Sequence, residues 1–321
     1  WISMLVRISL GASLPMAAQL EEPNMHLTVA ESVAARVGDS HSRCAALLWL
    51  ALVADRQGFP SSRMVFLDQA LSLMRDHHYE FLVTRRAMLG ADDPAVFLPL
   101  LLQAREDKIQ PELISQLLQP LHLQDCVYHP GYTLTLRTLG PFEARLGQRL
   151  VPPEAWKREK ARQLLMILAG SRPKALSREQ ASVLLWPDAD NATSINNFKV
   201  VVSALNQARE PARPAGSGPL FVLRRQDQVQ LNPDIEILVD HEIFEEQILS
   251  ARLEDKQSAM GLYRGRLFEG EPAQEWFMAE AQYLHRLYLE NSALVIEAAL
   301  AAGRLEEALT LTNRLLQIDP E

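Results

Sequence analysis

One stretch of the sequence has the residue types and spacing needed to read DNA. It is ATSINNFKVVVSALNQARE, residues 192–210, which predicts a helix. At about 100° per residue, four apolar residues fall within one third of its circumference and must face a core: Ile195, Phe198, Val202 and Leu205. The opposite side carries Thr193, Asn196, Lys199, Val200, Ser203 and Gln207, with Asn197 at its edge.

These side chains match the chemistry of base edges in the major groove. Asn and Gln make bidentate hydrogen bonds with adenine, Lys reaches guanine or phosphate, and Val contacts the thymine methyl group. We therefore predict that this face reads bases through Thr193, Asn196, Asn197, Lys199, Val200 and Ser203. A merely solvated polar face would look the same, so the helix by itself leaves both interpretations open.

The distribution of charge favours the DNA interpretation. The whole chain has a formal net charge of −8. Residues 131–232 contain 15 Lys and Arg against 8 Asp and Glu, a balance of +7, whereas residues 1–130 and 233–321 carry −4 and −11. A basic segment between two acidic ones indicates a polyanionic partner, above all nucleic acid.

Phosphate contacts would supply most of the salt-sensitive affinity. The predicted contacts lie at the helix that begins near residue 157, around the following helix, and in a C-terminal hairpin. They are Lys157, Arg158, Lys160, Arg162, Arg172, Lys174, Arg178, Arg224 and Arg225. The pair at the hairpin tip, Arg224 and Arg225, is the strongest candidate, because a hairpin can reach into a minor groove. Trp156 and Trp186 are expected in the core or at helix ends.

The elements that must position these residues follow the order of a winged helix-turn-helix, which we place at residues 128–233. TLTLRTLGPFEARLGQRLV alternates apolar and polar residues around two turns and predicts a small antiparallel sheet. Three helices and the hairpin PLFVLRRQDQVQLNP follow. In the second helix, Ser177 and Gln180 form a predicted capping box, and Pro187 ends the helix. In such a fold the second helix supports the third, which enters the major groove.

The flanking segments are predicted to be helical, so the fold class is mainly α: a helical-repeat segment, a small α+β winged-helix domain, and an all-α domain. Residues 1–127 are expected to form tetratricopeptide-like helix pairs, with breaks at Gly58 and Pro60 and helices opened by Pro94 and Pro111. Residues 234–321 are expected to form a second tetratricopeptide-like domain, in which Asp240 caps the first helix and Gly303, Ala308 and Pro320 match part of a repeat.

Other classes of site are not indicated. Cys44 and Cys126 are far apart and lack CxxC spacing, so a reducing cytoplasm is the default compartment. The sequence has no GxxxxGK[ST] loop and no HExxH motif, and it predicts no enzyme, cofactor or metal site.

The sequence begins at Trp1, and we expect it to be part of a longer chain. Its first 19 residues resemble a signal peptide, but a buried helix is the better interpretation, and we expect no membrane segment.

Two groups of motifs resemble a known family of regulators. LGPFEARLGQRLV, WKREKARQLLMILAGSRPKALSREQASVLLWPD and NNFKVVVSALNQAREP resemble the OmpR-type winged helix of SARP transcriptional regulators. LVDHEIFEE, AMGLYRGRLFEGE and EWFMAEAQYLHRLYLENSALVIEAALAAGRLEEAL resemble the bacterial transcriptional activator domain that follows it. PAVFLPLLLQAREDKIQPELISQLLQPL is similar to the helical-repeat region of maltose-regulator-like activators, in which a nucleotide-binding domain lies upstream.

The resemblance implies a sequence-specific transcriptional activator that binds repeated sites in double-stranded DNA and contacts RNA polymerase. Self-association through the helical repeats is a further expectation. The sequence departs from the family in two places. Many family members have an arginine-rich third helix, whereas the basic residues of the third helix here are Lys199 and, at its end, Arg209. The hairpin reads RRQDQVQL in place of the glycine-tyrosine pattern that is common in the family. The alternative is a protein-interaction scaffold that uses its winged helix to bind protein, which would leave the basic middle segment unexplained.

Overall fold

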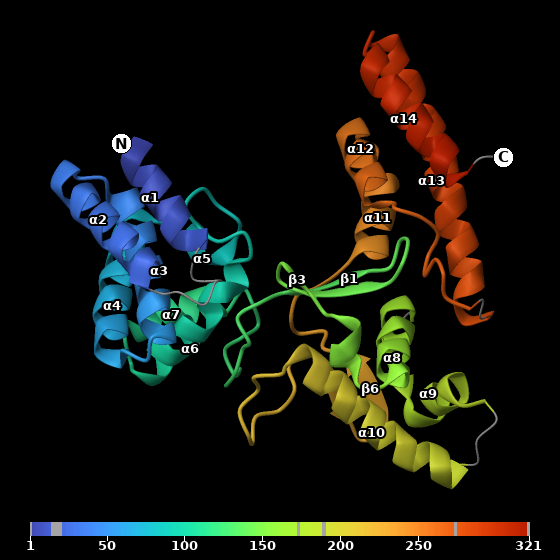
Figure 1. The fold of residues 1–321 in the computed structure, drawn as a ribbon, viewed down its shortest axis with the longest axis horizontal. Coiled ribbons are helices and arrows are strands. Elements are labelled where there is room, and N and C mark those ends of the chain that lie inside the picture. The colour runs from blue at the N-terminus through green and yellow to red at the C-terminus, as the bar shows by residue number, and fades with distance from the viewer. Residues whose placement is uncertain (1, 14–20, 172–173, 188–190, 273–274, 320–321) are drawn as a thin grey trace. The chain divides into compact units, whose positions relative to one another are not determined.

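The computed structural model describes residues 2–13, 21–171, 174–187, 191–272 and 275–319, which are mainly helical with small sheets (Figure 1). The mainly α prediction is thus confirmed. The chain forms two compact units. The first contains residues 1–133, 212–220 and 233–236, and the second contains residues 134–211, 221–232 and 237–321. The expected boundaries at residues 127 and 233 stay a prediction.

The first unit is a helical array in which α1 packs on α2, α2 on α3, and α3 on α4. Its elements are α1 (Ile2–Ser13), α2 (Glu21–Val37), α3 (Ser40–Arg56), α4 (Pro60–His77), α5 (Phe81–Thr84), the 3-10 helix η2 (Pro94–Phe97), α6 (Leu98–Glu106) and α7 (Pro111–Leu118). The predicted break at Gly58 and Pro60 separates α3 from α4, and Pro94 and Pro111 open helices as predicted. Helix α5 has only four residues and ends at Thr84.

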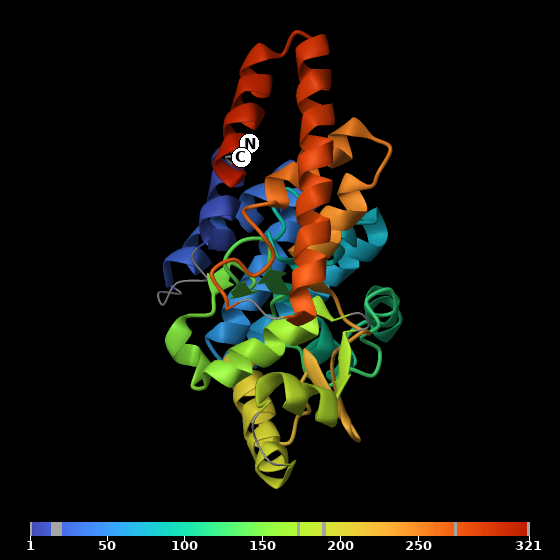
Figure 2. The same ribbon diagram turned by 90° about the vertical axis from the view of Figure 1, so that its right-hand side faces the viewer.

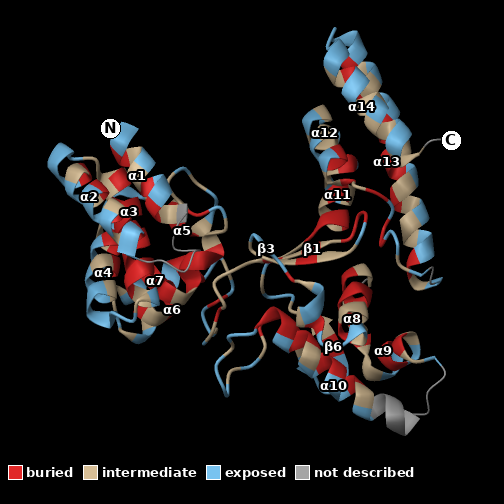
Figure 3. Cartoon of the chain, viewed as in Figure 1, coloured by how far each residue is buried: buried red, intermediate tan, exposed pale blue. Residues whose placement is uncertain are grey.

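Helix α3 is the centre of this array. Every residue from Cys44 to Ala54 is buried, so α3 is apolar all round, as a helix enclosed by its neighbours must be (Figure 3). Its first turn is fixed by Asp39, whose carboxylate accepts a hydrogen bond from the Ser42 N–H at 3.0 Å.

Among the described residues, no helix combines the length and the apolar composition needed to cross a membrane.

The packing of α1 on α2 depends on the absence of a side chain at Gly11. A Cβ atom placed there would lie 2.5 Å from Cγ of Leu27, which is fully buried. We therefore expect Gly11→Ala to destabilise the array by about 1–3 kcal/mol, since Leu27 has no room to move. Thermal or urea unfolding would measure this destabilisation. The control is Gly261→Ala, at a helical glycine where an added Cβ meets nothing within 4 Å. Unchanged stability in Gly11→Ala would show that α1 and α2 are not held in this contact.

The second unit begins with a four-stranded sheet in the order β3-β2-β1-β7. Its strands are β1 (Leu134–Arg137), β2 (Glu143–Leu146), β3 (Arg149–Leu150) and β7 (Ile237–Val239). The predicted alternation of apolar and polar residues is confirmed in β1, where Leu134 and Leu136 are fully buried and Thr135 and Arg137 between and after them are not. The parallel pairing of β7 with β1, which sets Leu134 opposite Ile237, was not predicted.

Three helices and a second small sheet follow. They comprise the 3-10 helix η3 (Pro153–Trp156), α8 (Glu159–Gly170), β4 (Ala175–Ser177), α9 (Arg178–Leu185), α10 (Asn191–Arg209), β5 (Val222–Arg225) and β6 (Gln228–Leu231). The predicted hairpin is β5–β6, and β4 adds a third strand beside β6. The capping box is confirmed: the Gln180 N–H donates to Ser177 Oγ at 3.0 Å, and the Ser177 N–H donates to Gln180 Oε1 at 2.9 Å.

Four helices complete the second unit: α11 (Asp240–Ile248), α12 (Leu253–Leu262), α13 (Glu275–Ala301) and α14 (Leu305–Ile318). Helices α13 and α14 run side by side as a hairpin (Figure 2). The turn between them contains Gly303, whose φ is +72°. The buried face of α13 includes Phe277, Leu284 and Val295.

Candidate nucleic-acid interface

Helix α10 has one buried side and one exposed polar side. Phe198, Val202 and Leu205 are buried, as the helical wheel predicted. Asn196, Lys199 and Ser203 are exposed, and Val200 is 44% exposed between them. Asn197 is half-buried, at the edge of this stripe. The side chains of Thr193 and Ile195 lie outside the described residues.

Packing of the buried side fixes the direction in which the exposed side points. Helix α10 contacts α8, α9 and η3, and the two ends of the exposed stripe are separated by about two turns. Trp156 of η3 is buried, so it is a core residue, as expected. At the C-terminal end of α10, Arg209 is fully buried and donates to Asn206 Oδ1 at 3.1 Å. Arg209 is therefore a structural residue, and Lys199 is the cation on the exposed side of the helix.

The β5–β6 hairpin carries two exposed arginines at its tip. Arg224 and Arg225 end β5, and Gln226 takes a left-handed backbone conformation, with a φ of +52°, in the turn to Gln228. The base of the hairpin is anchored by Val222 and Val229, which are fully buried. The hairpin thus presents positive charge on a support whose inner residues belong to the core.

The other predicted phosphate contacts fall into two groups. Lys157 and Arg158 are exposed just before α8, and Lys160 is half-buried in its first turn, whereas Arg172 lies outside the described residues. The second group forms ion pairs within the chain: Arg162 with Glu159 and Glu271, Lys174 with Glu242 at 2.5 Å, and Arg178 with Asp227 at 3.5 Å. Because these three cations already have carboxylate partners, they are weaker candidates than the first group.

The C-terminal helices pack against α8 and the first sheet. Leu139 and Met166 belong to the same apolar cluster as Phe268 and Phe277. The Arg162 guanidinium, which donates to Glu271, also lies over the Phe142 ring at 5.8 Å. These contacts leave Asn196, Lys199 and Ser203 exposed on α10.

This C-terminal part is the region that a known family matches. Residues 241–321 match the bacterial transcriptional activator domain. The match supports a C-terminal region of the kind found in SARP-like activators, and it concerns transcription regulation and no class of enzyme. The search of curated proteins found no match to the chain. We call residues 241–321 the activator-domain segment.

A buried hydrogen-bond network joins the activator-domain segment to the first sheet. Asp240, directly before this segment, accepts hydrogen bonds from the Thr138 N–H and hydroxyl, each at 2.6 Å, and from the Leu139 N–H at 3.3 Å. The Thr138 hydroxyl also lies 2.8 Å from Nδ1 of His241. Burial raises the pKa of Asp240, and the hydrogen bonds from Thr138 and Leu139 oppose that shift.

The expected role of Asp240 as a helix cap is therefore wrong. Val239 occupies the cap position, and Asp240 is the first helical residue. Its carboxylate binds backbone N–H groups 101 and 102 residues away in sequence instead of those of its own helix. The sequence shows a polar residue at the start of a helix, but it contains no pattern that indicates this distant partner.

Proposed function

We propose that the chain is a sequence-specific DNA-binding transcriptional regulator that acts as an activator. The observation that carries this proposal is the exposed stripe on α10, where Asn196, Lys199, Val200 and Ser203 lie on one side of a helix whose other side is buried. A helix held in this way can insert its polar side into a major groove without losing its own packing. The family match of the activator-domain segment supports a role in transcription.

The arrangement of the surrounding elements supports a winged helix at this place. Helices α8, α9 and α10 are followed by the β5–β6 hairpin, which is the order of elements in that fold. In this proposal α10 reads base edges through Thr193, Asn196, Asn197, Lys199, Val200 and Ser203. Lys157 and Arg158 contact the phosphate backbone, and the hairpin acts as the wing.

We assign transcription-related contacts to the activator-domain segment. Residues 241–321 contain 7 Lys and Arg against 15 Asp and Glu, a balance of −8, so the net charge of this segment opposes DNA binding. RNA polymerase is its proposed partner, and the helical array of the first unit is the proposed site of self-association. The acidic segment leaves Asn196, Lys199 and Ser203 of α10 exposed.

The wing arginines are expected to contribute through charge. Replacing Arg224 and Arg225 by Ala should weaken binding to all DNA sequences alike. It should also reduce the slope of log affinity against log salt by roughly 1 for each phosphate that is no longer neutralised. Fluorescence anisotropy at several salt concentrations measures this slope. Arg286→Ala, which removes an exposed charge from α13, is the matched control and should leave the slope unchanged. An unchanged slope in the wing variant would remove the hairpin from the interface.

The proposal as a whole is tested by selecting sites for the complete chain from random duplex DNA, with binding repeated at two salt concentrations. An enriched motif, together with affinity that falls steeply as salt rises, is the expected result. Salt-sensitive binding without enrichment would mean a nonspecific DNA-binding protein. Absence of binding at low salt would overturn the proposal and favour a scaffold that binds proteins.

A further inference from the structure

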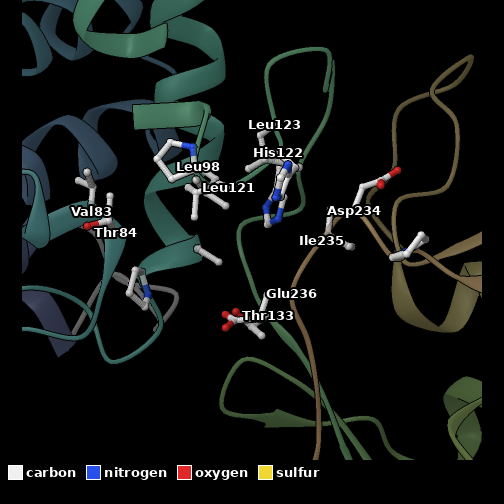
Figure 4. Close-up of a pocket in the computed structure, with 15 residues that line it drawn as sticks. Val83, Thr84, Leu98, Leu121, His122, Leu123, Thr133, Asp234, Ile235 and Glu236 are labelled. Atoms are coloured by element: carbon white, nitrogen blue, oxygen red, sulfur yellow. The ribbon is translucent and has the colours of Figure 1, made fainter. Parts of the chain in front are cut away.

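The first unit contains a pocket of about 300 Å³, which lies at the lower end of the range for small-molecule sites (Figure 4). Its walls come from α5, η2, the start of α6, the chain after α7 and residues 233–236. One buried polar side chain, the imidazole of His129, also lines this space. We propose that the pocket binds a small uncharged ligand, with a compact apolar body and one hydrogen-bond acceptor that receives the Nε2–H of His129.

The enclosed part of the pocket is apolar because it belongs to the core. Val83, Leu98 and Leu123 are buried members of the main apolar cluster of the first unit, and they also line the pocket. Leu121 and Ile235 are partly buried against the same cluster. Core packing holds these side chains in place, so an apolar body that contacts them would be removed from water against a preformed wall.

The hydrogen bonding of His129 leaves one N–H group for a ligand. Its Nδ1 accepts a hydrogen bond from the Gly131 N–H at 3.1 Å. Burial lowers the pKa of His129 to about 4, so the imidazole is neutral at pH 7 and its single proton is on Nε2. Among the described residues, Nε2 has no hydrogen-bond partner, and it is not sealed inside the core. This N–H group is therefore available to an acceptor in the pocket.

The two threonine hydroxyls that line the pocket are already used as donors. Thr84 donates to the Glu80 carbonyl at 3.0 Å, and Thr133 donates to Oδ1 of Asp93 at 2.9 Å. Their protons are committed to the fold, whereas the Nε2–H of His129 is not. His129 is thus the buried group that can fix the orientation of a ligand by donating a hydrogen bond.

The distribution of charge around the pocket favours an uncharged ligand. None of the buried side chains that line it is ionised. Its two carboxylates, on Asp234 and Glu236, are exposed, and in Figure 4 they point away from each other. An ionised group on a ligand would therefore lose hydration without meeting a buried counter-charge, which is unfavourable.

Isothermal titration calorimetry with the complete chain at pH 7 tests the proposal with two probes of nearly the same shape, acetophenone and α-methylstyrene. The ketone has a carbonyl oxygen where the alkene has a CH₂ group, so only the ketone can accept the Nε2–H. We expect acetophenone to bind about three- to tenfold more tightly, which corresponds to one neutral hydrogen bond. Benzoate and benzylamine, which carry a charge on a body of similar size, should bind more weakly than acetophenone.

The variant His129→Asn tests the residue that anchors the ligand. The Asn side-chain oxygen can still accept the Gly131 N–H, but the shorter side chain no longer places a donor where Nε2 lies. Acetophenone should then bind no more tightly than α-methylstyrene. The control is His78→Asn, which changes an exposed histidine of the same unit that does not line the pocket, and it should keep the preference for the ketone.

The location is tested by Leu121→Trp, which fills the pocket from a half-buried position and should abolish binding of both probes. Circular dichroism would establish that the variants fold. The proposal is overturned if neither probe binds, if both bind equally tightly, or if folded Leu121→Trp still binds them. It is also overturned if His129→Asn keeps the full preference for the ketone, or if a charged probe binds as tightly as acetophenone. The test needs no DNA, so its outcome is independent of the proposed function.

Discussion

Asn196→Ala and Lys199→Ala are each expected to weaken binding to the selected DNA site by about 1–3 kcal/mol. This is the cost of removing one good interaction with a base. The effect on nonspecific DNA should differ between the two variants. An amide that reads a base gives no affinity to random sequence, whereas the Lys199 ammonium also attracts phosphates, so its removal weakens nonspecific binding as well.

Neither substitution should harm the fold. Both side chains are exposed, and Ala favours helix at both positions. The control is Gln207→Ala: Gln207 is exposed on the same polar side of α10 but is not among the predicted base-reading residues, because it lies two turns or more beyond Lys199. Anisotropy titrations against the selected site and against a scrambled site measure all three variants. Wild-type affinity in both Asn196→Ala and Lys199→Ala would move the reading surface away from α10.

Asp240→Ala is expected to cause the largest decrease in stability, about 3 kcal/mol or more. The substitution leaves the buried N–H groups of Thr138 and Leu139 without their acceptor, and it removes the link between β1 and α11. Urea unfolding of the complete chain would show the decrease in the transition of the second unit. Glu246→Ala, which removes an exposed carboxylate from the same helix, is the control and should change stability by less than about 0.5 kcal/mol.

The pH dependence gives an independent check of the same carboxyl group. Its pKa is raised by burial above the ordinary value of 3.8, so the folded state binds this proton more tightly than the unfolded state does. Below the ordinary pKa, protonation of Asp240 makes its full favourable contribution to the stability of the folded state. It is lost as the pH rises from that value through the raised pKa. Asp240→Asn should remove this part of the pH dependence, and an unchanged pH profile in that variant would contradict the assignment.

Local patterns were sufficient to predict several features of the candidate interface. The two sides of α10 followed from the spacing of Phe198, Val202 and Leu205, because burial in a helix repeats every 3.6 residues. The Ser177 capping box and the break at Pro60 also depend only on residues close in sequence. These predictions succeed because the interactions involved span no more than two or three turns of helix.

Features that depend on distant partners were not predicted. Strand β4 has three residues and exists because it pairs with β6, more than fifty residues later. Strand β7 similarly pairs with β1 across about a hundred residues. The ion pair between Arg162 and Glu271 occupies one predicted phosphate-binding residue through a partner 109 residues away. A single sequence contains no signal for such pairings, so it does not separate the basic residues that bind DNA from those that hold the fold together.

Repeating the selection from random duplex DNA with Asn196→Ala tests the central claim most directly. If α10 reads base edges, the wild-type chain enriches a defined motif. The variant should then lose its preference at one or two adjacent base pairs while keeping the rest of that motif. An identical motif from both proteins would contradict the claim, because it would mean that the exposed side of α10 does not specify the sequence that is bound.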